Sequence, residues 1–313
     1  MIDAGVVTAQ TLLLLLAAPA VAGYVRWLKA RLQGRRGAGM LQPYFELRRT
    51  FAKHMVIADS ASWIFHLAPF VLMAATVAAA TLVPVVSAVQ PADRLGDLFV
   101  LAALLMLGTV WLALGGLDPG TAFGGMGSSR EMTVAALTEP TLAISVLALA
   151  LATGSTSLGA IAGRVAATPA FALGPGHSLA LAAFLIALLA ETGRLPVDNP
   201  ATHLELTMIH EAMILEYSGP YLGLILWASA VKMTLLLVLA ANVFLPWGLA
   251  TSLGPWAIAV GLAAIAAKLV VLGGLLALLE TRLAKLRLFR VPELLAVSFT
   301  LALIAAASSF YTR

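Results

Sequence analysis

The chain has 313 residues, of which 61% are hydrophobic and only 11% are charged; its mean hydropathy is +0.98 and its net charge is +4. A water-soluble domain carries about 25% charged residues, so this chain lacks the polar surface that a soluble protein of its length needs. The composition predicts an all-α integral membrane protein and gives no basis for a nucleic-acid partner. The apolar runs are continuous, whereas the strands of a transmembrane barrel are short and alternate.

Eight apolar segments predict transmembrane helices. They lie at about 4–25, 65–89, 98–117, 133–157, 177–190, 217–245, 256–280 and 293–311. The first resembles a secretory signal, but Asp3 and the absence of a basic residue before the leucine run favour a retained helix. We expect a single polytopic membrane domain over residues 1–313, with cytoplasmic loops at about 26–64, 118–132, 191–216 and 281–292.

The distribution of Lys and Arg predicts the orientation of these spans. With the N-terminus outside, fourteen of the nineteen basic residues lie on the inner side and three on the outer side, while Lys232 and Lys268 fall within spans. Both termini then lie on the outer side of the cell's inner membrane. The polar segment 191–216 faces the cytoplasm.

The longest inner segment, 26–64, is basic and contains GRRGAGMLQPYFELRR at 34–49. Its second part predicts an amphipathic helix along the inner membrane surface. We expect its basic residues to fix the topology and to contact anionic lipid. The alternative is that they also dock a soluble partner. The candidate docking residues, with one from a later loop, are Arg35, Arg36, Arg48, Arg49 and Arg194.

A second polar feature, from Glu191 to Gly219, holds five of the fifteen carboxylates. They are Glu191, Asp198, Glu205, Glu211 and Glu216, and His203 and His210 lie among them. Apolar residues alternate with the acids from 208 to 215, which favours a partly buried helix over 201–219 rather than a solvated loop. A carboxylate at the membrane edge is costly unless it is paired or hydrated, and histidine titrates near neutral pH. The stretch is therefore a candidate proton relay.

Ionisable residues inside spans are functional candidates by default. Lys232, Lys268 and Glu139 join the candidate relay, with snorkelling or structural pairing as the alternatives. Two enzyme classes are not supported: His210 and Glu211 lack the second histidine of a zinc protease, and the glycines at 124–129 lack the context of a nucleotide-binding loop. The histidines and carboxylates match no strong metal site, so no metal is expected in this chain.

Two motifs resemble those of the respiratory complex I subunit 1 family: AETGRLPVDNP followed by LEYSG, and the region 34–49. The resemblance covers essentially the whole chain and implies eight transmembrane helices where a hydrophilic arm meets a membrane arm. Gly193 stands where quinone-reducing members usually have Asn, and the segment between AET and EYSG is three residues longer. This form resembles the membrane subunit of energy-converting, membrane-bound NiFe hydrogenases of the formate hydrogenlyase, hydrogenase-4 or CO-induced type.

The resemblance implies a non-catalytic subunit that anchors the electron-transfer arm and couples redox chemistry to proton movement. The implied partners are the hydrogenase large and small subunits, a ferredoxin-like iron–sulfur subunit and antiporter-like membrane subunits. The iron–sulfur clusters and the Ni–Fe centre would belong to these partners, since the chain has no cysteine. The alternatives are the quinone-site subunit of a complex I-type NADH or ferredoxin:quinone oxidoreductase, and a stand-alone ion transporter.

Overall fold

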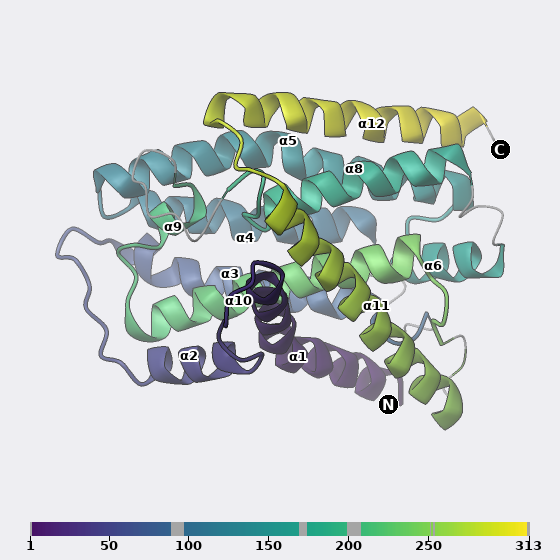
Figure 1. Cartoon of the computed structure of the whole chain (residues 1–313), viewed down its shortest axis with the longest axis horizontal. Helices are drawn as coiled ribbons and strands as arrows, with labels where there is room; N and C mark the ends of the chain where they lie inside the picture. The colour runs from purple at the N-terminus through teal and green to yellow at the C-terminus, as the bar shows by residue number, and fades with distance from the viewer. Residues whose placement is uncertain are drawn as a thin grey trace.

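The structure is a computed structural model that describes residues 2–88, 97–168, 174–198, 208–250, 252 and 254–311. Within these ranges the chain is helical, and its only β-type pairings are two isolated bridges. Most of the helices lie side by side along the long axis of the molecule (Figure 1). The predicted all-α class is confirmed.

The helix bounds follow the apolar runs of the sequence closely. The helices are α1 (Ile2–Leu32), α2 (Gln42–Phe51), α3 (Trp63–Leu82), α4 (Leu98–Leu117), α5 (Ala122–Thr153), α6 (Leu158–Ala167), α8 (Pro175–Glu191), α9 (His210–Met213), α10 (Gly219–Leu239), the π-helix η1 (Ala240–Phe244), α11 (Pro255–Arg282), the 3-10 helix η2 (Leu288–Arg290) and α12 (Val291–Tyr311).

The protein is a multi-pass membrane protein. Seven of the described helices are long and apolar enough to span a bilayer. The segment expected at 177–190 forms α8, which has 17 residues, fewer than the roughly 20 that a bilayer usually requires. The count of eight spans and the outer position of both termini therefore stay predictions.

Two segments differ from expectation. α5 begins at Ala122 rather than near 133, so the glycine-rich stretch 124–129 is helical. Small residues are needed there because a side chain at Gly124 would collide with the carbonyl of Gly116, and one at Gly127 would meet Ala212.

The helix expected over 201–219 is wrong in its described part, where only α9 is helical; residues 201–207 lie outside the described ranges. Tight turns follow α9, with Tyr217 N–H donating to the Ile214 carbonyl at 3.1 Å. These turns let Met213, Ile214 and Tyr217 all be buried, at 5% exposure or less.

The LEYSG motif joins the start of α10 to the connection between α2 and α3 through hydrogen bonds. Ser218 Oγ donates to the Val56 carbonyl at 2.8 Å and accepts from the Val56 N–H at 2.9 Å. Gly219 has φ +54° and lies close to the carbonyls of Lys53 and His54, which leaves no room for a side chain. The motif therefore has a structural role at this position.

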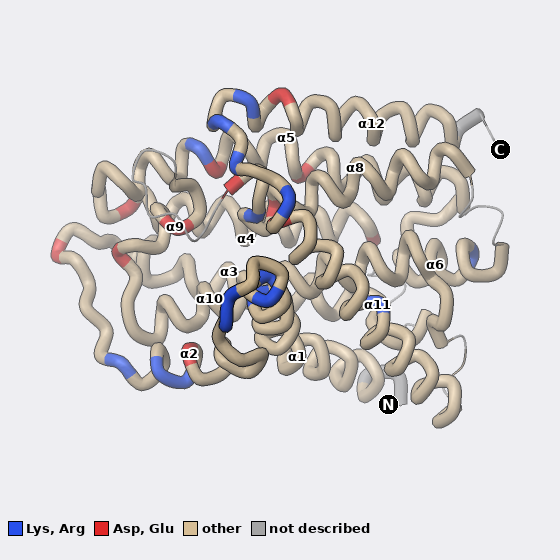
Figure 2. The backbone as a smooth tube through the Cα atoms, in the orientation of Figure 1, with Lys and Arg blue, Asp and Glu red and all other residues tan. Residues whose placement is uncertain are grey.

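Charged residues gather toward one end of the bundle, which carries α2 and α9 and is called here the α9 end (Figure 2). The opposite end carries few of them. The positive-inside rule predicts that the α9 end faces the cytoplasm.

Candidate functional site: a charged cavity at the α9 end

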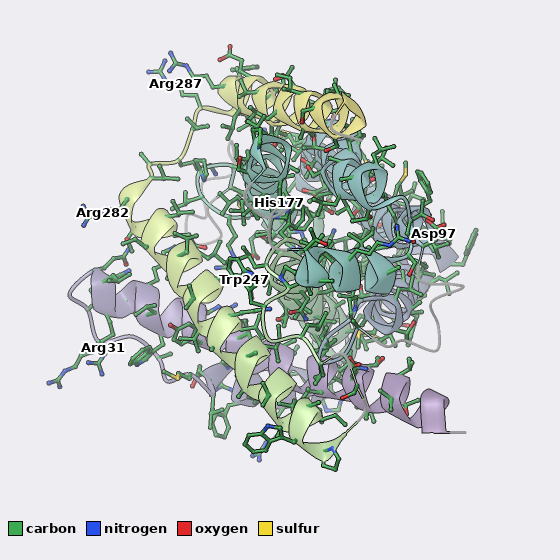
Figure 3. All side chains as sticks on the ribbon, turned by 90° about the vertical axis from the view of Figure 1, so that its right-hand side faces the viewer. Arg31, Asp97, His177, Trp247, Arg282 and Arg287 are labelled. Carbon is green, nitrogen blue, oxygen red and sulfur yellow. The ribbon has the colours of Figure 1, made fainter. Side chains whose placement is uncertain are left out.

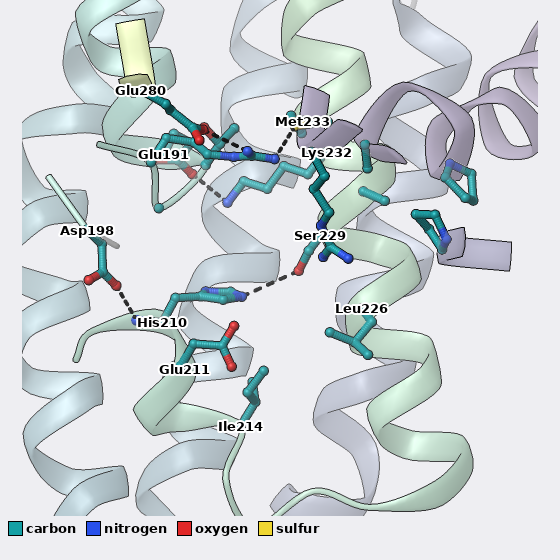
Figure 4. A pocket seen from close by; sticks show the side chains of 18 of the residues that line it. Glu191, Asp198, His210, Glu211, Ile214, Leu226, Ser229, Lys232, Met233 and Glu280 are labelled. Carbon is teal, nitrogen blue, oxygen red and sulfur yellow. Dashed lines mark hydrogen bonds and ion pairs between the residues drawn. The ribbon is translucent and has the colours of Figure 1, made fainter. Parts of the chain in front are cut away.

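A cavity of about 450 Å³ lies toward the α9 end, and residues of α1, α2, α3, α4, α5, α8, α9, α10 and α11 line it. Its wall holds both carboxylates and basic groups in nearly equal number. The carboxylates are Glu46, Glu131, Glu191, Asp198, Glu211 and Glu280, and the basic residues are Arg26, Lys29, Arg35, Arg194 and Lys232. Figure 4 shows that several of these side chains point toward one another across the cavity. A buried charge requires a partner, so the pairs decide what the cavity can do.

The first pair joins α8 to α10. Glu191 ends the apolar run of α8 and is only 8% exposed. Its Oε1 lies 2.5 Å from Nζ of Lys232, and the same Nζ donates to Thr109 Oγ1 at 3.1 Å. Thr109 Oγ1 is in turn 3.5 Å from Glu191 Oε1. Three helices thus supply one carboxylate, one ammonium and one hydroxyl at a single point.

The second cluster places one carboxylate between two basic groups. Glu280, near the end of α11, lies 2.7 Å from Lys29 Nζ of α1 through one oxygen and 2.7 Å from an Arg194 nitrogen through the other. Its side chain is 2% exposed. Arg194 also approaches the Met233 sulfur at 2.9 Å. Glu280 thereby ties α1, α11 and the turn after α8 together.

Gly193 gives Arg194 this position. Its φ of +58° ends α8, while Gly193 N–H donates to the Ala190 carbonyl at 3.0 Å and Arg194 N–H to the Leu189 carbonyl at 2.9 Å. Helices often end on a residue in this left-handed conformation, usually Gly and sometimes Asn. Gly193 therefore supplies the left-handed residue at which α8 ends.

Asp198 organises the segment that follows. It is 3% exposed; Oδ1 accepts from Lys285 Nζ at 2.9 Å and Oδ2 lies 3.3 Å from the N–H groups of both Ile209 and His210. The Leu286 N–H also donates to the Pro196 carbonyl at 2.9 Å. The connection between α11 and α12 therefore holds the acidic segment in place.

His210 lines the cavity with its Nε2 3.5 Å from Ser229 Oγ. Burial, and next the positive charge of Lys232, lower the pKa of His210 to about 4. Its imidazole is therefore neutral near pH 7. The expectation that this histidine titrates near neutral pH is wrong, because burial disfavours its charged form.

The remaining relay candidates are placed unequally. Glu211 lines the cavity. Glu139 lies outside the lining but within electrostatic reach of Glu191 and Lys232, and its buried Oε1 has no hydrogen-bond partner among the described residues. Glu216 lies beyond α9 and is absent from the described lining. Glu205 falls outside the described ranges.

Lys268 belongs to a separate network. Its Nζ donates to the Ala241 carbonyl at 3.0 Å and to Asn242 Oδ1 at 3.2 Å, both in η1. Lys268 and Glu280 are both on α11, twelve residues or roughly 18 Å apart. The structure therefore does not bring Lys268 to the cavity.

The candidate docking residues differ in their exposure to solvent. Four are exposed, and they are Arg35, Arg36, Arg48 and Arg49. Arg35 lies at the cavity wall, close to the Arg26–Glu46 ion pair of 3.0 Å that joins α1 to α2. Arg194 lies inside the cavity with its side chain 14% exposed. Its place beside Glu280 gives no surface for a partner.

Several partners in these clusters were not singled out from the sequence. The sequence indicates only that Lys29 and Lys285 belong to the basic residues that set the membrane orientation. Thr109 lies in an apolar span, where a single threonine is common. Glu280 lies at the end of the predicted span 256–280, and no motif there distinguishes it. The available signal was the presence of Glu280, Lys29 and Lys285 at the same predicted membrane surface. In the described ranges, no group of three His, Asp or Glu side chains is placed to hold a metal ion.

Comparisons with known proteins agree with this architecture. The chain is 34% identical over 299 residues to formate hydrogenlyase subunit 4 of Escherichia coli (strain K12), covering 96% of each chain. It is 33% identical over 300 residues to hydrogenase-4 component C of the same organism, covering 95% of this chain and 93% of the relative.

Among solved structures, the fold resembles a chain in the structure of the membrane-bound sulfane sulfur reductase (MBS), an archaeal respiratory membrane complex. The TM-score is 0.79 at 19% identity, covering 97% of this chain and 99% of that one. Residues 5–310 match the family described as NADH dehydrogenase. With nearly its whole length matched, the chain belongs to the NADH dehydrogenase family of membrane subunits that includes these hydrogenase relatives.

Proposed function

We propose that this chain is the membrane-anchoring and proton-coupling subunit of an energy-converting, membrane-bound NiFe hydrogenase complex in the cell's inner membrane. The two relatives at 33–34% identity are components of hydrogenase systems by name and are matched over almost their full length. The single observation that carries the coupling role is the cavity in which Glu191–Lys232 and Lys29–Glu280–Arg194 lie together.

The physical basis of coupling is the response of a buried pair to nearby charge. A unit charge that appears about 8 Å away changes the energy of another by about 2 kcal/mol at an effective dielectric constant of about 20. That change shifts a protonation equilibrium by more than about tenfold. An electron that arrives in a soluble arm docked at the α9 end would therefore change the electrostatic energy of the charged side chains in this cavity.

The relay proposed from this geometry is centred on Glu191 and Lys232, with Thr109 as the bridging hydroxyl. Asp198, Glu211 and the neutral His210 extend it along the cavity wall toward solvent, and Glu139 extends it into α5. Glu205, Glu216 and Lys268 remain proposals with weaker geometric support.

The exposed basic residues near the cavity are proposed to receive the soluble arm. Arg35 and Arg36 follow α1, and Arg48 and Arg49 end α2. The partners are the hydrogenase large and small subunits, a ferredoxin-like subunit and antiporter-like membrane subunits. Electron transfer would occur in the iron–sulfur clusters and Ni–Fe centre of these partners, and this chain would contribute only charge-sensitive groups.

The test compares Glu191→Gln with Glu46→Gln in the assembled complex. Both variants remove one carboxylate from the cavity wall, but Glu46 is paired with Arg26 near the mouth, where its side chain is 44% exposed. We expect Glu191→Gln to leave the complex assembled and to lower hydrogen evolution coupled to proton movement, and Glu46→Gln to change neither. Normal coupled turnover in Glu191→Gln would refute the relay.

The second candidate is a quinone-site subunit of a complex I-type oxidoreductase. It is favoured by the family description and by the apolar part of the cavity wall, which includes Leu72, Leu112 and Leu226. Mass spectrometry of the complex pulled down with a tagged chain discriminates the two. Ni–Fe hydrogenase subunits with hydrogen evolution support the first, and flavin- and NADH-linked subunits with quinone reduction support the second.

A further inference from the structure

A second group of basic side chains lies outside the cavity, at the ends of α1 and α11 and at η2. Its members are Arg31, Arg282, Arg287 and Arg290, together with Phe289, and they are named here the lateral basic strip. All four arginines are exposed, and Phe289 is 90% exposed. In the described part of the chain, no carboxylate lies within ion-pair distance of these arginines.

The strip faces sideways from the bundle. Figure 3 shows Arg31, Arg282 and Arg287 pointing to the same side, away from the helices. In Figure 1 the connection between α11 and α12 is set back from the left-hand end of the molecule, which is formed by the connection from α2 to α3 and by the start of α5, with α9 nearby. The strip is thus displaced from the surface to which a soluble arm would bind end-on.

The length of the connection fixes its depth. Residues 283–290 join two helices that are each long and apolar enough to span a membrane, α11 and α12. Because this connection is short, its residues must lie in or close to the polar headgroup layer. Basic side chains at this depth are attracted to anionic headgroups, and exposed apolar side chains beside them insert at the boundary of the acyl chains.

The strip has the side chains that such a layer favours. Phe289 lies between Arg287 and Arg290 in sequence, and Leu283 is 40% exposed just after Arg282. On α1 the guanidinium of Arg31 lies 5.2 Å from the centre of the Trp27 ring, and tryptophan is enriched at membrane interfaces. A soluble acidic partner would explain the arginines but would leave the apolar side chains at this depth without a role.

We propose that the lateral basic strip binds anionic phospholipid in the leaflet at the α9 end. The site adjoins the contacts that position the acidic segment. Lys285, three residues after Arg282, pairs with Asp198. Lys29, two residues before Arg31, pairs with Glu280. Lipid bound to the strip would therefore hold α1, α11 and the cavity wall in their observed arrangement. The proposal does not depend on which redox complex contains the chain.

The experiment uses the full complex in nanodiscs of phosphatidylcholine. Spin-labelled phosphatidylglycerol and spin-labelled phosphatidylcholine are added in turn, and electron paramagnetic resonance measures the fraction of each that is bound to protein. The strip variant combines Arg282→Gln, Arg287→Gln and Arg290→Gln. The control removes one exposed arginine on α6, at the end opposite α9, with Arg164→Gln, and it is compared both with the strip variant and with the single substitution Arg287→Gln.

We expect the wild type and the control to prefer phosphatidylglycerol, and the strip variant to lose most of that preference. Each arginine near an anionic surface contributes about fivefold in affinity, so three give a loss well above about tenfold. The preference should weaken as ionic strength rises. Replacing the same three arginines by lysine should retain it, which separates lost charge from misfolding.

Three outcomes would overturn the proposal. An unchanged preference in the strip variant means that the strip is not the lipid site. An equal loss in Arg287→Gln and in the control Arg164→Gln means that only net charge matters. Loss of soluble subunits from the strip variant with the lipid preference intact would identify the strip as a protein-docking surface instead.

Discussion

Glu280 offers the sharpest test of the cavity, because one carboxylate serves two basic groups. Glu280→Gln keeps the size of the side chain and removes its charge. Lys29 and Arg194, with side chains 20% and 14% exposed, would then face each other without a counter-ion. The predicted result is a loss of stability far greater than an ordinary surface ion pair could account for.

The expected magnitude follows from the burial of the three groups. Breaking a buried pair by removing one partner costs about 3–5 kcal/mol. Lys29 can turn its flexible stem toward solvent, which offsets part of the loss. Arg194 cannot do so, because its backbone closes the end of α8 and its guanidinium lies against Met233. We therefore expect about 3 kcal/mol, at the lower end of the range.

The assay is a denaturant titration of the full-length chain in detergent micelles, with Glu46→Gln as the matched control. The Arg26–Glu46 pair has a similar separation, 3.0 Å, but side chains 59% and 44% exposed. Exposed pairs contribute about 0–1 kcal/mol. Combining Glu280→Gln with Lys29→Met should recover about 1 kcal/mol or more, since it removes one uncompensated charge. Equal stability losses in Glu280→Gln and Glu46→Gln would refute the reasoning.

Three further predictions concern single side chains. The pKa of His210 is about 4 in the folded chain against 6.5 ordinarily, so the unfolded chain binds more protons between these two pH values. The contribution of His210 to stability is therefore full above pH 6.5 and falls by up to roughly 3 kcal/mol toward pH 4. His210→Gln should flatten this part of a stability–pH profile. Gly193→Asn should be tolerated, whereas Gly193→Val should cost roughly 1–2 kcal/mol and lower the midpoint of thermal denaturation. A Cβ at this position would meet only His210 Cβ, at 3.7 Å, so steric collision is not the cause. An equal effect of both substitutions would contradict the left-handed turn as the cause. Glu139→Gln should reduce proton movement coupled to hydrogen evolution more strongly than Lys268→Met does, and the reverse order in a vesicle assay would show that the relay does not pass through α5.

The fold was largely predictable because its main determinants are local. A run of apolar residues specifies a spanning helix wherever it occurs, so the spans at 98–117 and 256–280 matched α4 and α11 within two residues at each end. The start of α5 was missed because glycines normally disfavour a helix interior. Close packing against Gly116 and Ala212 overrides that propensity, and such packing is a tertiary property.

The site was predictable in its residue types and not in its pairings. Glu191, Asp198 and Lys232 were singled out as acids or bases in apolar surroundings, and each lies in the cavity. The pairs join residues that lie far apart in the chain: Asp198 pairs with Lys285, and Lys29 pairs with Glu280 more than two hundred residues later, so no sequence periodicity connects them. The neutral state of His210 likewise depends on burial by distant elements, which local sequence does not encode.

The packing of α10 restricts where a proton in the proposed relay can go. Beyond Lys232, the seven residues from Leu235 to Ala241 are each at most 2% exposed, and they form about 10 Å of close-packed aliphatic helix. This stretch offers no side chain that could carry a proton toward Lys268. Glu139, by contrast, lies on α5, which packs against α8. It is within electrostatic reach of Glu191 and has a buried oxygen without a partner in the described chain, the kind of atom that an ordered water satisfies. In the proposed relay, Glu139 on α5 is therefore favoured over Lys268 as the next group that receives a proton from the cavity.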